Sequence, residues 1–222
     1  MIQIDRIERS RRKTIAILIE EDGSLVIRAP KRTTNAQIKK LVQDKSDWIR
    51  KKQDQVKLQY QESQPKRYVD GEKFLFLGKT YPLTIVKGVE PSLVLNKRFY
   101  LSAPGTKNGE PLFTAWYKKR AREIIPARVE LYASKFRLHY ERVRITSAKK
   151  RWGSCSSAGN LNFSWRLVMA PIPVIDYVVI HELAHLINKN HSKAYWGTVK
   201  RMMPDYKQYV IWLKENGHRL TL

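Results

Sequence analysis

One segment constrains the fold more than any other: residues 174–187 have apolar side chains in almost every direction around a helix. Nine of the fourteen are Val, Ile, Leu or Ala, and a helix that is apolar on all sides is buried. The same segment contains His181, Glu182 and His185. Burial of an ionisable side chain costs free energy unless the group is paired or binds a metal. The segment therefore predicts a functional site built inside a core.

The spacing of the histidines indicates which kind of site. His181 and His185 are four residues apart, so both imidazoles leave the same face of a helix. In an H-E-x-x-H motif the two histidines bind zinc and the glutamate faces the zinc-bound water. His191 follows six residues later, and on a continuous helix it would lie about 9 Å beyond His185. We therefore expect the helix to end at Asn188 or Asn190, because asparagine tolerates the left-handed conformation.

Three histidine ligands would leave one open tetrahedral position, as a catalytic zinc requires. Other interpretations stay open. The histidines can be hydrogen-bonded core residues without a metal, or part of a structural zinc site with Cys155 as fourth ligand. The third catalytic ligand can also be Glu215 or Asp205 in place of His191.

Four short motifs resemble the YgjP-like family of metal-dependent hydrolases, which is related to the WLM and SprT-like zinc peptidases. The motifs are Arg151–Ser156, Leu161–Leu167, His181–His185, and Asn190–Ser192 with Tyr195 and Trp196. The resemblance implies an α+β, zincin-like fold in which a mixed sheet packs on the active-site helix. It also implies Zn2+ bound by His181, His185 and His191, with Glu182 as the general base.

The region before these motifs predicts a β-rich N-terminal half. Hairpins are expected at Asp22-Gly23 and Gly78-Lys79, and one long helix is expected from Thr34, as N-cap, to Gln59. The Gly- and Pro-rich segment Ser102–Pro111 is the expected linker. The expected domains are thus residues 1–104, β-rich with one long helix, and residues 112–222, a zincin-like catalytic domain.

In the second half, a helix is expected over Phe113–Leu138, kinked or divided by Pro126. Alternating apolar residues over Leu161–Met169 predict one strand. A short helix is expected to follow Ser192 as N-cap and to end near Met203.

Four further residues are candidates for substrate binding. Arg166, on the polar face of the expected strand, can hold an anionic group through two hydrogen bonds. Tyr177, one helical turn before His181, can donate to a developing oxyanion. Arg151 and Trp152 can contact substrate or simply pack.

The net charge is strongly positive. The 43 Lys and Arg exceed the 20 Asp and Glu to give +23, which favours an anionic substrate, a nucleotide or non-specific nucleic-acid binding. Residues 142–175 contain six basic and no acidic residues. A single cysteine, the absence of a secretory signal and the lack of a long apolar run predict a soluble, cytoplasmic protein without a membrane partner. No oligomeric state is indicated.

The expected function is that of a zinc-dependent metallohydrolase, a metallopeptidase-like enzyme that uses a zinc-bound water and Glu182 as base. Two alternatives remain. The resemblance also fits a nucleotide pyrophosphatase that converts nucleoside triphosphates such as UTP to the monophosphate and pyrophosphate. The basic runs Lys118–Arg122 and Arg142–Arg151 also fit a nucleic-acid-associated protease.

Overall fold

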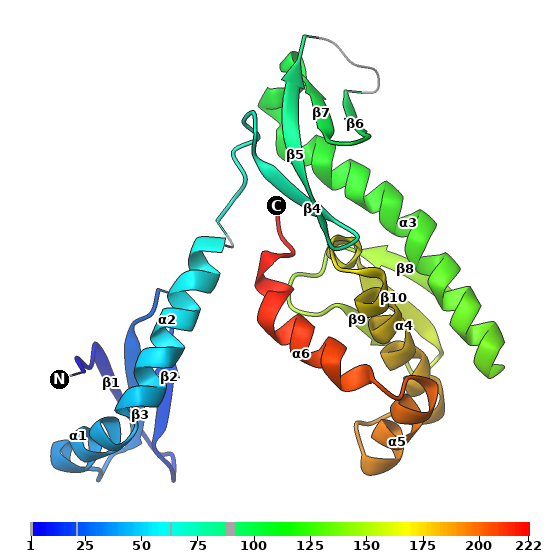
Figure 1. Ribbon diagram of the computed structural model, residues 1–222. Coiled ribbons are helices and arrows are strands. Elements are labelled where there is room, and N and C mark those ends of the chain that lie inside the picture. The colour runs from blue at the N-terminus through cyan, green and yellow to red at the C-terminus, as the bar shows by residue number, and fades with distance from the viewer. Residues whose placement is uncertain (1, 21, 63, 88–91) are drawn as a thin grey trace. The chain divides into compact units, whose positions relative to one another are not determined.

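A computed structural model describes residues 2–20, 22–62, 64–87 and 92–222 (Figure 1). The chain divides into two compact units, Met1–Gln64 and Pro65–Leu222, which we describe separately. The boundary thus lies at Gln64, whereas the sequence predicted a linker at Ser102–Pro111. That segment instead contains a 3-10 helix, Ala103–Asn108, with Gly105 buried. Strands before it and helices after it share one hydrophobic core, so no separation occurs there.

The first unit is a small sheet with two helices. The strands are β1 (Arg6–Ser10), β2 (Ala16–Ile19) and β3 (Leu25–Pro30), in the order β1-β3-β2. The pairing of β2 with β3 is antiparallel, as expected for the first hairpin, and β1 runs parallel to β3. The core consists of Leu25, Ile27, Ala29, Ile38, Val42 and Ile49.

The expected long helix is present as two helices, α1 (Asn35–Asp44) and α2 (Ser46–Glu62). The capping box of Thr34 and Gln37 is confirmed. The break falls at Lys45, whose backbone is not helical and whose N–H bonds to carbonyls of the preceding turn. The prediction of one continuous helix was therefore wrong, because no side chain in the sequence marks this break.

The second unit begins with a four-stranded sheet in the order β4-β5-β7-β6. Its strands are β4 (Lys73–Phe76), β5 (Lys79–Val86), β6 (Leu93–Leu95) and β7 (Phe99–Ser102). Strands β4 and β5 pair antiparallel, which confirms the hairpin at Gly78-Lys79. Helix α3 (Gly109–Phe136) follows and continues through Pro126 without dividing.

A second, mixed sheet has the order β8-β10-β9, with β8 (Arg142–Thr146), β9 (Gly153–Cys155) and β10 (Asn160–Ser164). Strand β10 is parallel to β8 and antiparallel to β9. The expected strand Leu161–Met169 is wrong beyond Ser164, where the chain turns into a 3-10 helix, Trp165–Met169. Three consecutive residues, Leu167, Val168 and Met169, are all buried. Successive residues of a strand point to opposite faces, so this segment no longer follows the alternation expected of a strand with one polar face.

Three helices complete the second unit: α4 (Ile172–Ile187), α5 (Lys193–Met202) and α6 (Tyr206–Asn216). Helix α4 packs against α3, α5, α6 and β9, in the centre of the unit (Figure 1). Ser192 caps α5 as expected. The α+β class is confirmed, and so is the arrangement of a mixed sheet on the helix that carries H-E-x-x-H. In the described part of the chain, no helix is both long and apolar enough to cross a membrane.

Candidate metal centre

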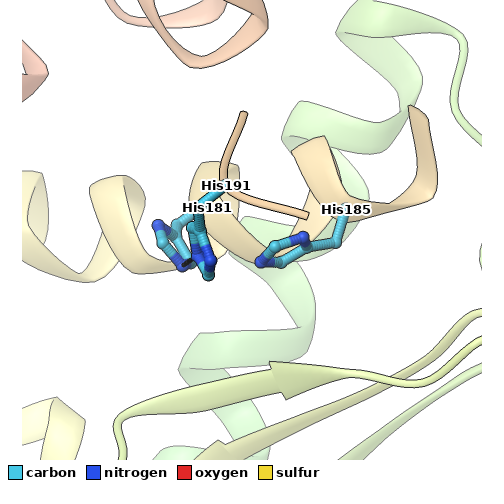
Figure 2. Close-up of side chains that lie close together, drawn as sticks. All are labelled: His181, His185 and His191. Atoms are coloured by element: carbon cyan, nitrogen blue, oxygen red, sulfur yellow. Dashed lines mark hydrogen bonds between the residues drawn. The ribbon is translucent and has the colours of Figure 1, made fainter. Parts of the chain in front are cut away.

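Three histidines from two parts of the chain come together at the C-terminal end of α4. Ligand atoms of His181, His185 and His191 all lie within 4.8 Å of one another, and Figure 2 shows the three imidazoles gathered in one place. The Nε2 atoms of His181 and His191 are 3.2 Å apart. Two nitrogens bound to one tetrahedral zinc at 2.0–2.1 Å would be about 3.3 Å apart. The residues present thus fit a metal ion, with imidazole donors only.

The end of α4 makes this convergence possible. The helix stops at Ile187, which agrees with the expected end before His191. However, Asn188 is extended (φ −128°, ψ 109°), and neither Asn188 nor Asn190 is left-handed. The expected left-handed turn is therefore wrong. Instead, the side chain of Asn188 donates to Oγ1 of Thr198 at 3.0 Å, which ties the chain to α5 as it leaves the helix.

Hydrogen bonds on the far side of the rings orient two of the histidines. Nδ1 of His185 lies 3.1 Å from the carbonyl oxygen of Asn188. A carbonyl only accepts, so Nδ1 carries the proton and Nε2 keeps its lone pair for a ligand. Nδ1 of His181 lies 3.5 Å from the hydroxyl of Tyr177. Tyr195 contacts both residues. Its ring stacks on the His185 ring, with the ring centroids 4.5 Å apart, and its hydroxyl donates to the backbone carbonyl of His181.

The surroundings keep two of the histidines, His181 and His185, uncharged. Burial, together with the smaller contributions of the neighbouring His185 and His191, lowers the pKa of His181 to about 4. Burial also lowers the pKa of His185. A neutral imidazole is the form that binds a metal. At neutral pH His181 and His185 are therefore in the form that binds a cation.

Glu182 follows His181 on α4 and is 96% buried, with only 4% of its surface exposed. Burial raises its pKa to about 8, opposed by the positive charge of Arg151. Strand β9 runs directly beside it, because a Cβ on Gly153 would lie 2.5 Å from Oε1 of Glu182. The carboxyl group is thus held between the active-site helix and the edge of the mixed sheet.

The four residues predicted to bind substrate have different surroundings in the structure. Arg151 and Trp152 line a polar pocket next to β9. Tyr177 is buried, and its hydroxyl faces His181. Arg166 lies in the 3-10 helix rather than in a strand, and it donates to the carbonyl of Ser147 while its guanidinium stacks on Trp165 at 4.2 Å.

Within the described ranges, no cysteine or carboxylate joins the histidine cluster. The structure therefore does not bring Cys155, Asp205 or Glu215 into the position of a ligand. Sequence reasoning missed two residues that shape the site, Gly153 and Thr198. The sequence does carry a signal for Gly153, since a glycine inside a strand often marks the close approach of another segment, whereas nothing in the sequence marks Thr198.

Three comparisons relate this chain to known proteins. A sequence profile described as "YgjP-like, metallopeptidase domain" matches residues 13–216. A UTP pyrophosphatase of Escherichia coli (strain K12) is 46% identical over 39 residues, which make up 18% of this chain and 23% of that protein. The match thus spans less than a quarter of that relative. The crystal structure of the metallopeptidase zymogen of Pyrococcus abyssi abylysin covers 45% of this chain and 100% of its own, with 21% identity and a TM-score of 0.40.

Proposed function

This chain belongs to the YgjP-like family of metallopeptidase domains, and on that premise we propose that it is a zinc-dependent hydrolase of peptide bonds. One observation carries the proposal. Ligand atoms of three imidazoles lie within 4.8 Å of one another, and the buried carboxyl group of Glu182 lies on the helix that carries two of them. This is the combination that single-metal hydrolysis requires.

The donor set supports zinc among the metals. Imidazole nitrogen suits zinc and other late transition metals, whereas magnesium and calcium prefer carboxylate and carbonyl oxygen. His181, His185 and His191 would hold the ion through nitrogen, and three protein ligands leave a position open. When bound, zinc would make a water ligand more acidic and polarise the carbonyl oxygen of a substrate.

Glu182 would move the proton in this reaction. Its Oε1 faces Gly153 at the edge of the sheet, and its pKa of about 8, set by burial, lies near neutral pH. A group with such a pKa can accept a proton from the attacking water and then donate it to the leaving amine. Tyr195 and Asn188 keep the imidazoles in place while this occurs.

The test compares two variants with the wild-type protein. Bound metal is measured by elemental analysis, and hydrolysis is measured on an unfolded protein such as reduced casein. Glu182→Gln should retain one metal per chain and lose activity by at least about 100-fold, a typical contribution of a general base. His185→Ala should lose both metal and activity. If Glu182→Gln cleaved the substrate at the wild-type rate, the assignment of the base would be wrong.

A second candidate function is hydrolysis of nucleoside triphosphates to the monophosphate and pyrophosphate. The observation that favours it is the short match to a UTP pyrophosphatase, together with the acid-free stretch 142–175. The two functions separate in one experiment. The same three proteins are assayed with UTP, and released pyrophosphate is measured beside casein cleavage. UTP turnover that depends on Glu182, with no casein cleavage, would favour the second function.

A further inference from the structure

A polar pocket lies on the opposite face of the mixed sheet from Glu182. Residues paired across a sheet share a face, so Asn162 lies beside Ser154 on one side and beside Arg144 on the other. The neighbouring residues Leu161 and Phe163 are fully buried and point to the core, so Asn162 points outward. The pocket has a volume of about 240 Å3 and is lined by Thr146, Ala148, Arg151, Trp152, Gly153, Ser154, Asn162 and Ser164.

The loop of residues 147–152, which supplies part of the lining of this pocket, is held by hydrogen bonds at both ends. The Ser164 hydroxyl donates to the carbonyl of Ala148, and the Ser164 N–H donates to the carbonyl of Trp152, both at 2.8 Å. Arg166 donates to the carbonyl of Ser147 at 3.2 Å. Because these bonds hold both ends of the loop, the pocket exists before any ligand binds.

The lining contains hydrogen-bond donors that have no acceptor among the described residues. Ser154 accepts a bond from the side-chain amide of Asn162 at 3.3 Å. Among the described residues Ser154 donates its own hydroxyl proton to no acceptor, so that proton is available. The guanidinium of Arg151 has five donors and makes no side-chain hydrogen bond with the described residues. These groups recognise oxygen atoms that carry negative charge.

The surroundings of the pocket carry a concentration of positively charged side chains. Arg144, Lys149, Lys150 and Arg151 all come from the strand and loop around the pocket, and all four are exposed. None of them forms an ion pair with a carboxylate in the ranges that the structure describes. Unpaired cations around a concave polar surface attract anions and focus them there.

We infer that this pocket binds a phosphate group that belongs to a nucleotide or to a nucleic-acid strand. Arg151 and the hydroxyl of Ser154 would contact phosphate oxygens, and Trp152 offers an aromatic surface for a base. The volume of about 240 Å3 holds a phosphate group with part of its ester rather than a whole nucleoside triphosphate. The inference requires no metal at the histidine cluster, so it stands independently of the proposed hydrolase activity.

Direct binding measurements test the inference. The full-length Glu182→Gln protein is used to exclude turnover, and it is dialysed against a chelator so that phosphate at a metal does not contribute. The probes are inorganic phosphate, uridine monophosphate and a fluorescein-labelled ten-residue oligothymidine. Adding Arg151→Gln should weaken binding by about tenfold or more, and adding Ser154→Ala by about fivefold, as expected for one charged and one neutral hydrogen bond.

A matched control separates the pocket from the general positive field. Lys79→Gln removes one equal charge from an exposed position at the start of β5, and it should change binding of phosphate and uridine monophosphate by less than about twofold. If the binding of uridine monophosphate depends on Arg151 and Ser154, the ligand of the pocket is a free nucleotide. If only the binding of oligothymidine depends on these two residues, the ligand is a nucleic-acid strand. Equal losses in Lys79→Gln and Arg151→Gln, or unchanged binding of every probe in Ser154→Ala, would overturn the inference.

Discussion

A methyl group on Gly153 would lie 2.5 Å from Oε1 and 2.7 Å from Cγ of Glu182, closer than real Cβ atoms approach their neighbours. Strand β9 and helix α4 are thus in contact at the carboxyl group that we assign as the base. Only glycine leaves this space, because any other residue at position 153 would push the carboxyl group away.

The first prediction concerns Gly153→Ala. The added methyl group should displace the carboxyl group of Glu182 and reduce hydrolysis by about 100-fold, as expected for a misplacement of about 1 Å. Bound metal should stay at the wild-type level, because the three histidines are untouched. Initial rates and metal content check this. Gly197→Ala on α5 is the matched control, since its Cβ would meet only Nη1 of Arg201, at 3.9 Å. Full activity of Gly153→Ala would contradict the assigned position of the base.

The second prediction concerns pH and the stability of the metal-free protein. Burial raises the pKa of Glu182 from 4.5 to about 8, so the folded state retains a proton that the unfolded state has lost. Stability that depends on this proton is present below pH 4.5 and decreases as the pH rises towards 8. Glu182→Gln resembles the protonated form and lacks this dependence. In a chelator, the unfolding temperature of the variant should therefore rise relative to that of the wild type between pH 5 and pH 8. A difference in unfolding temperature that stays constant over this range would disprove the effect.

The third prediction concerns the support of His185 from α5. Thr198 is buried and accepts a hydrogen bond from Asn188, whose carbonyl oxygen contacts His185. Thr198→Val should weaken metal affinity by about tenfold, the usual effect of losing a partner behind a metal ligand. Competition with a fluorescent chelator measures this affinity. Thr198→Ser retains the hydroxyl and should bind metal as the wild type does.

The fourth prediction concerns the ion pair that joins α3 to α4. Arg128 donates two hydrogen bonds of 2.6 Å to Asp176, whose side chain is only 8% exposed. Arg128→Ala would leave this carboxylate buried without its counter-ion and should reduce the free energy of unfolding by about 3 kcal/mol. Urea denaturation measures the change. Arg120→Ala breaks the exposed pair with Glu123 and should cost less than about 1 kcal/mol.

The sequence predicted the features that depend on local spacing. The position of His185 relative to His181, the cap at Thr34 and the hairpin at Gly78-Lys79 are encoded within a few residues of one another. The end of α4 before His191 was also predicted, although from the wrong conformation of Asn188.

The remaining features depend on contacts between distant segments. Thr198 fixes Asn188 across ten residues, and Gly153 meets Glu182 across twenty-nine positions of the sequence. The boundary between the two units also escaped prediction. Glycine and proline mark irregular backbone, and Ala103–Asn108 is such a segment, but it is packed into the larger unit. Composition identifies a turn and does not reveal which core the turn belongs to.

The all-nitrogen donor set of the histidine cluster has a practical consequence for anyone who purifies this protein. Imidazole binds nickel and copper as readily as zinc, and their affinities follow the Irving–Williams order rather than any preference of the protein. Passage over a nickel affinity resin can therefore load the cluster with nickel before the first assay. Magnesium in a buffer would leave the cluster unaffected, because no carboxylate among the described residues joins it. The metal found in a purified sample therefore depends on how that sample was prepared.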